Sequence, residues 1–180
     1  GGTRVMGLSL ALQNKQWMYL NGVILVSPAD YRTLRVGGPV SSALNLPYYT
    51  AASWYHKKLN EDLQKLDLLD VLPISEDYAI NKLIPAIAKG GALPLKEKEK
   101  IAKKMSYFSG ISEKVILQHN LDLPESFFWK ELLRDEGFTV GRLDSRYKGI
   151  DRKQSGDNPD YNSELDSWEH SFTPAINQYI

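Results

Sequence analysis

Apolar residues at helical spacing, broken repeatedly by proline and glycine, dominate the chain from about residue 41 onward. Because residues three or four apart share one face of an α-helix, this spacing predicts helices that each bury one side. Serine, proline and glycine stand at the expected ends of several segments, as at Ser75, Ser112, Pro124 and Gly137. The expected fold class is mainly α, with helices over residues 47–59, 75–89, 95–108, 112–119, 124–136 and 163–179.

The N-terminal stretch combines a helix with one apolar run. Thr3 is placed to cap a helix whose apolar residues recur at Val5, Leu8 and Leu12. The stretch "NGVILVSP" then predicts a strand over residues 22–26, and its lack of alternation is typical of strands covered on both faces. One strand cannot make a sheet, so we expect it to pair with a second copy of the chain, to be covered by helices or to be remodelled.

Two segments do not fit the helical pattern. "YRTLRVGGPVSS" (31–42) contains Gly-Gly-Pro, and "RYKGIDRKQSGDNPDYNSE" (146–164) is long, polar and rich in turn residues. Both are predicted to be loops.

Charge and cysteine content exclude several classes of function. Lysine plus arginine and aspartate plus glutamate each total 22, so no overall field attracts a nucleic acid or an anionic membrane surface. Apolar runs such as "VILV" fall far short of the roughly 20 residues that span a bilayer. The chain has no cysteine, which excludes disulfides, thiolate metal sites and cysteine nucleophiles. We expect no nucleic acid, no membrane and no cofactor.

The histidines show no catalytic or metal-binding pattern. His56, His119 and His170 lie far apart in the sequence, each in a predicted helix. A local zinc motif would place two histidines about one helical turn apart, and a serine nucleophile would stand in a glycine-flanked elbow. We therefore expect no metal ligand and no catalytic residue in this chain.

The stretch "KEKEKIAKKM" (96–105) allows two interpretations. Its glutamates interleave with lysines at a spacing that favours pairs four residues apart, which is typical of a solvated helix face. Followed by "SGISEKVILQHN", it also resembles a helix-turn-helix, although the balanced charge argues against DNA binding. We expect Lys98 and Lys103 on a solvated face, and Trp54 and Trp129 mostly buried among apolar neighbours.

The polar stretch "VGRLDSRYKG" follows a predicted helix and contains the candidate substrate-binding residues Arg142, Asp144, Arg146 and Tyr147. Arginine and aspartate two or four residues apart form either a structural ion-pair network or a guanidinium site for a substrate carboxylate. Both alternatives remain open from the sequence.

Four stretches, "LQNKQWMYLNGVILVSP", "LNLPYYTAASWYHKKL", "FFWKELLRDEGFTVGRLDSRY" and "HSFTPAINQYI", are similar to bacterial members of the serine carboxypeptidase-like family. The resemblance runs over nearly the whole chain. It implies an α/β-hydrolase in which residues 1–28 supply one core helix and one core strand and residues 29–180 form the helical cap (insertion) domain. Gly1 would match the last glycine of the nucleophile elbow, and Thr3 one of the residues after it.

The same resemblance implies a fragment without its own chemistry. The nucleophile serine would precede Gly1, and the triad aspartate and histidine would follow Ile180. The full-length parent would be a serine-type carboxypeptidase that removes C-terminal residues from peptides through an acyl-enzyme, or a related acyltransferase, and would be exported. The rival interpretations are a free-standing helical protein-interaction module and a helix-turn-helix regulator.

Overall fold

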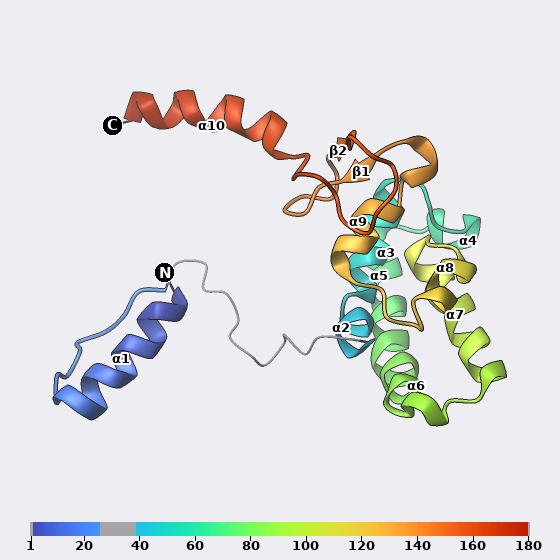
Figure 1. Cartoon of the computed structure of the whole chain (residues 1–180), viewed down its shortest axis with the longest axis horizontal. Helices are drawn as coiled ribbons and strands as arrows, with labels where there is room; N and C mark the ends of the chain where they lie inside the picture. Colours follow the sequence, from blue (N-terminus) through green and yellow to red (C-terminus); the bar gives the residue numbers. More distant parts are fainter. Residues whose placement is uncertain (1, 26–38, 180) are drawn as a thin grey trace. The chain divides into compact units, whose positions relative to one another are not determined.

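The computed structural model describes residues 2–25 and 39–179 of the chain (Figure 1). The chain divides into two compact units, Gly1–Gly37 and Gly38–Ile180. The described residues are mainly helical, as the apolar spacing predicts, and they also contain one small two-stranded sheet that was not predicted. The boundary expected after residue 28 falls outside the described residues.

The first unit contains α1 (Gly2–Gln16) and an irregular segment over residues 17–25. Because α1 begins at Gly2, Thr3 lies within its first turn, and the prediction that Thr3 caps the helix is wrong. Trp17 has a left-handed φ of 56°, and the Met18 amide donates to the Leu12 carbonyl at 3.1 Å. The segment after this reversal runs back alongside α1 (Figure 1).

The strand predicted over residues 22–26 is not formed in its described part. Residues 22–25 have no regular secondary structure, and Val26 lies outside the described residues. A strand requires a neighbour that accepts and donates its backbone hydrogen bonds, and the described part of this unit offers none. Ile24 is left 88 % exposed. Self-association through this apolar segment stays a prediction.

The second unit is a succession of helices followed by a β-hairpin and a last helix (Figure 1). In chain order its elements are α2 (Pro39–Leu44), α3 (Leu46–Tyr55), α4 (Glu61–Gln64), α5 (Leu68–Tyr78), a π-turn (Ala79–Leu83), α6 (Ile84–Ala88), a 3₁₀ turn (Gly90–Ala92), α7 (Leu95–Ser109), α8 (Glu113–Gln118), α9 (Glu125–Glu131), a 3₁₀ turn (Arg134–Glu136), β1 (Thr139–Val140), β2 (Lys148–Gly149) and α10 (Leu165–Tyr179).

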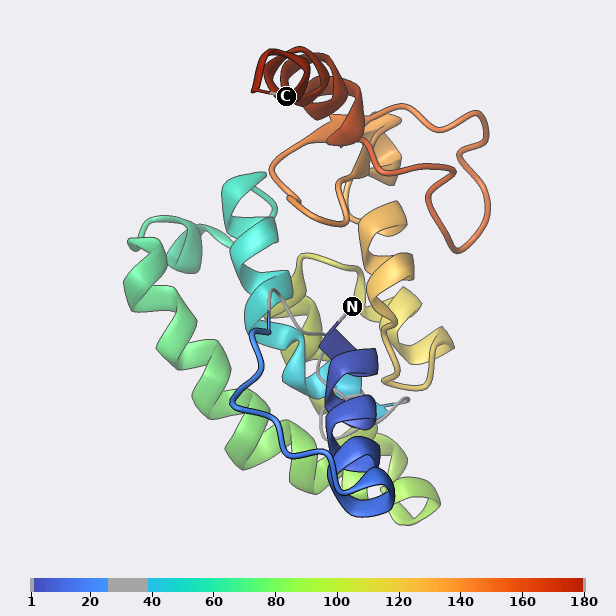
Figure 2. The ribbon, with the colours of Figure 1, turned by 90° about the vertical axis from the view of Figure 1, so that its left-hand side faces the viewer.

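The long helical run of α5, the π-turn and α6 begins earlier than predicted. Figure 2 shows it as one nearly continuous rod. Ser75 does not cap it, because Ser75 lies buried inside α5 and its hydroxyl donates to the Leu72 carbonyl at 2.9 Å. Pro73 explains the error: proline usually interrupts a helix, yet α5 passes through it.

Among the other predicted element boundaries, some are confirmed by the structure and others are wrong. α7 and α8 lie where the spacing predicts them, and the Ser112 hydroxyl accepts from the Val115 amide at 3.4 Å as the N-cap of α8. The loop predicted over residues 31–42 is wrong at its end, because residues 39–42 belong to α2, and its beginning lies outside the described residues. The helix predicted over 124–136 is α9, which ends at Glu131.

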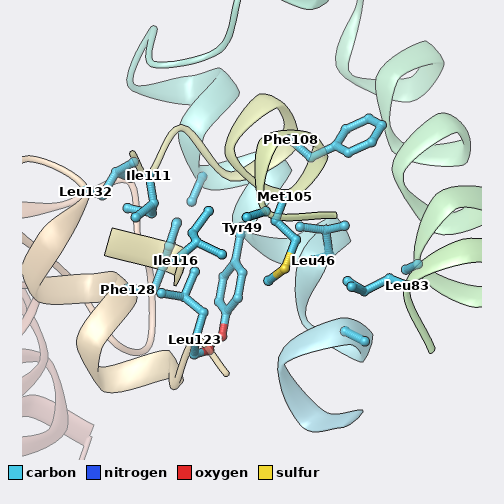
Figure 3. Close-up of a cluster of buried hydrophobic side chains, with 14 of the residues drawn as sticks. Leu46, Tyr49, Leu83, Met105, Phe108, Ile111, Ile116, Leu123, Phe128 and Leu132 are labelled. Carbon is cyan, nitrogen blue, oxygen red and sulfur yellow. Dashed lines mark hydrogen bonds between the residues drawn. The ribbon is translucent and has the colours of Figure 1, made fainter. Parts of the chain in front are cut away.

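The core of the second unit lies where α3, α7 and α9 converge (Figure 3). The ring of Tyr49 stacks on Phe128 with centroids 4.2 Å apart, and its hydroxyl donates to the Leu123 carbonyl at 2.8 Å. Burial raises the pKa of the Tyr49 phenol well above its ordinary value. Trp54 and Trp129 pack against this core with most of their surface covered, as predicted.

The hairpin, the polar segment after it and α10 complete the unit. β1 pairs antiparallel with β2, so that Thr139 faces Gly149 and Val140 faces Lys148. No residue of α10 is buried, and its apolar side chains Phe172 and Ile176 are largely exposed. Among the described residues, no helix has the length and apolar character needed to cross a membrane.

Candidate functional site

The loop over residues 141–147, which joins β1 to β2, holds all four predicted substrate-binding residues. Three hydrogen bonds close it. The Gly141 amide donates to the Tyr147 carbonyl at 3.0 Å, and the Tyr147 amide donates to the Asp144 carbonyl at 3.1 Å. The Ser145 hydroxyl donates to the Gly141 carbonyl at 2.7 Å. These bonds fix the loop's shape, so its side chains project from a defined frame.

Asp144 and Arg146 form the ion pair that the sequence offers as one alternative. Arg146 Nε donates to Asp144 Oδ1 at 2.9 Å, and Nη2 donates to Oδ2 at 2.6 Å. This bonding by Arg146 holds the pKa of the Asp144 carboxyl below its ordinary value. The Arg146 side chain is nevertheless 67 % exposed, so the guanidinium is oriented by Asp144 and still open to a ligand.

The other two predicted residues lie on either side of this pair. Arg142 is exposed at the start of the loop. Tyr147 is half-buried, and its ring meets Trp168 of α10 edge to face at 5.9 Å. The loop therefore presents two arginines to solvent, while Tyr147 attaches it to α10.

Three side chains that sequence reasoning did not identify support the loop over residues 141–147: Tyr48, Trp129 and His56. The Tyr48 hydroxyl bonds to the Ser145 hydroxyl and accepts from Trp129 Nε1 at 2.7 Å. Since the Ser145 proton goes to Gly141, Tyr48 donates in its bond to Ser145. Burial raises the Tyr48 pKa, which keeps this donor protonated. His56 Nε2 donates to the Ser145 carbonyl at 2.6 Å.

Glu164, just before α10, is fully buried against the same loop. Its Oε1 accepts from the Leu143 amide at 2.8 Å, and its Oε2 has no hydrogen-bond partner in the described part of the chain. A Cβ at position 141 would overlap both Glu164 Oε2 and the Asp144 carbonyl oxygen. Position 141 therefore requires glycine, because Glu164 and the Asp144 carbonyl lie too close to the backbone there to leave room for a Cβ atom.

The nearby serine and histidine do not make a nucleophile. His56 contacts the carbonyl of Ser145 and not its hydroxyl, and that hydroxyl donates to a backbone oxygen. A general base must accept the nucleophile's proton, which this geometry does not allow. His119 packs on the Phe127 ring at 4.0 Å, and His170 is exposed on α10. Across residues 2–25 and 39–179, no cluster of three metal-ligating side chains is found.

The lysines of α7 differ from their predicted arrangement. Glu97 pairs with Lys89 at 2.7 Å instead of with a lysine of its own helix. Lys98 is half-buried as a residue, and its ammonium donates to the Asn120 side-chain oxygen in an exposed hydrogen bond, which does not contradict its placement on a solvated face. Lys103 is exposed as expected.

The position of His56 gives a pH prediction. Burial lowers the His56 pKa, opposed by the bond to Ser145 and modulated by Lys148, Glu136 and Lys58. Below the ordinary histidine pKa of about 6.5 the unfolded chain is more fully protonated at this residue than the folded chain, so the free energy of unfolding should decrease as the pH falls below that value. We expect urea unfolding between pH 7.5 and 5 to show a steeper decline for the wild type than for His56→Gln. An equal decline in the free energy of unfolding for the wild type and His56→Gln would contradict a lowered His56 pKa in the folded chain.

Gly1, the expected elbow glycine, lies outside the described residues, and so does the side chain of Thr3. Comparisons with protein-family models, with curated proteins and with solved structures each found no match to this chain.

Proposed function

We propose that the chain supplies the helical cap of a serine carboxypeptidase-like α/β-hydrolase. The observation that supports this most is the contrast between its middle and its two flanking helices. The core runs from Ala43 to Val140, whereas α1 and α10 carry exposed apolar side chains such as Leu10 at 62 % and Phe172 at 65 %. A cap inserted into a larger enzyme needs its own core and apolar surfaces that pack against the catalytic body.

The chain's part in such an enzyme is to cover and bind, and the bond-breaking groups lie elsewhere. In the proposed parent, a serine outside these residues attacks the C-terminal peptide bond and forms an acyl-enzyme. The loop over residues 141–147 suits a contact with a carboxylate because Asp144 orients the Arg146 guanidinium and Arg142 adds a second cation. We assign carboxylate binding to these two arginines.

A helical protein-interaction module is the second candidate. The exposed face of α10, with Phe172, Ile176 and Tyr179 at 65, 57 and 91 %, favours it, because apolar side chains at this spacing form a docking stripe. The helix-turn-helix regulator has no comparable support. α8 (Glu113–Gln118) would be its recognition helix, and it is short and contains one lysine, Lys114.

The coding sequence on either side of this chain distinguishes the two candidates. The cap proposal expects Gly-x-Ser-x directly before Gly1 and an aspartate and a histidine in the sequence after Ile180, with a secretory leader upstream. An initiator methionine immediately before Gly1 would contradict it and favour the interaction module.

A further inference from the structure

A cavity of about 210 Å³ lies between the end of α6, the glycine turn after it, α7 and the turn that follows α8. One part of its wall is apolar: Ala86 and Leu121 belong to the buried core, and Ile87 and Leu93 pack against that core. Gly90 and Gly91 form another part of the lining, and a Cβ at either would meet nothing within 4 Å. The cavity therefore has an apolar wall and an open, side-chain-free edge.

Lys98 places a cation among the described residues that line this cavity. The Lys98 ammonium donates to the side-chain oxygen of Asn120, which also lines the cavity, in an exposed hydrogen bond, although the Lys98 residue as a whole is half-buried. Within the described residues, no carboxylate lies within ion-pair distance of Lys98, whereas Lys89 is neutralised by Glu97. An ammonium bonded only to a neutral amide keeps its charge available to an anion that enters the cavity.

The turn that supplies Asn120 and Leu121 has costly backbone geometry. These two residues take successive left-handed φ values of 57° and 66°, a region that disfavours residues with a Cβ. Hydrogen bonds from the Leu121 amide to the Ile116 carbonyl at 3.1 Å and from the Asp122 amide to the His119 carbonyl at 2.9 Å hold them there. Strain of this kind concentrates at ligand sites, and here it places an amide and an apolar side chain on the same cavity.

We propose that this cavity binds a small monocarboxylate, with the carboxylate on Lys98 and a short apolar chain against Ala86, Ile87 and Leu121. At about 30 Å³ for each heavy atom, a cavity of this size holds about seven such atoms, close to the roughly eight heavy atoms of a six-carbon carboxylate. The site is independent of the proposed cap function and lies on different residues from the arginine loop.

The test uses three six-carbon probes on the whole chain: hexanoate, hexanol and hexylammonium. Calorimetric titration should show hexanoate binding at least tenfold more tightly than either of the others, because only hexanoate satisfies both the wall and the ammonium. Equal binding of the three probes, or no binding of hexanoate at millimolar concentration by the folded chain, would overturn the proposal.

Three variants locate the site. Lys98→Met keeps most of the length of the side chain and removes its charge, so the preference for hexanoate over hexanol should disappear. Lys96→Met, at an exposed position of the same helix outside the cavity, is the matched control and should keep that preference. Gly91→Leu should block all binding without backbone strain, because only Gly90 of the two glycines has a positive φ. Circular dichroism establishes that each variant is folded, and an unchanged preference in folded Lys98→Met would refute the site.

Discussion

Replacing Asp151 by alanine is expected to lower the free energy of unfolding by about 3 to 5 kcal/mol, because it leaves the Lys130 ammonium buried without its counter-ion. The Lys130 and Asp151 side chains are 3 % and 4 % exposed, and Lys130 Nζ lies 2.5 Å from Asp151 Oδ2. Lys130 also donates to the Lys153 carbonyl, and Asp151 Oδ1 accepts from the Asp160 amide at 2.9 Å. The pair thus fastens the polar segment after the hairpin to α9.

Urea unfolding followed by circular dichroism measures this loss, with Asp157→Ala as the control at an exposed position of the same segment. The control should change stability by less than about 0.5 kcal/mol. The double variant Lys130→Met/Asp151→Ala should recover much of the loss, because no uncompensated charge stays buried. A single Asp151→Ala variant as stable as the control would show that the pair is not buried in solution.

Phe128→Ala is expected to cost about 3 to 5 kcal/mol by opening a cavity at the centre of the core. The Phe128 ring is fully buried, stacks on Tyr49 at 4.2 Å and meets the Tyr48 ring edge to face at 5.9 Å. Tyr48 in turn supports the arginine loop, so the same substitution should loosen that loop. Hydrogen exchange at the Gly141 and Tyr147 amides reports this second effect.

Phe172→Ala is the matched control, since Phe172 is 65 % exposed on α10 and should contribute less than about 0.5 kcal/mol. Equal losses for the two substitutions would mean that α10 is buried in solution, for example against a second copy of the chain. Such equal losses would contradict the exposure of the apolar face of α10, on which the cap proposal depends.

Local patterns predicted the helices well where caps and apolar spacing agree. α7 and α8 are examples, since Ser112 both signals and makes a cap. The errors arise where tertiary packing overrides a local signal. Pro73 indicates a break, yet the helix continues through it, and the apolar run near Ile24 indicates a strand although no partner strand is described for it.

The candidate site likewise combines a local contact that the sequence predicts with long-range contacts that it does not. The pair Asp144 and Arg146 is two residues apart and could be proposed from the sequence, and its ion pair is present. Tyr48 and His56 reach Ser145 across 97 and 89 residues, and Glu164 reaches Leu143 across 21. No periodicity or spacing encodes such contacts, because they depend on how α3, the hairpin and the segment before α10 pack together. The burial of the Lys130 and Asp151 pair could not be predicted from the sequence for the same reason.

Labelling with a serine-directed fluorophosphonate, read by intact mass and peptide mapping, tests the proposed cap function most directly. The isolated chain and the protein expressed with its flanking coding sequence are treated in parallel. The cap proposal predicts that the isolated chain stays unlabelled and that the longer protein is labelled at the serine two positions before Gly1. Stoichiometric labelling of a serine within these 180 residues, or a longer protein that takes up no label, would contradict it.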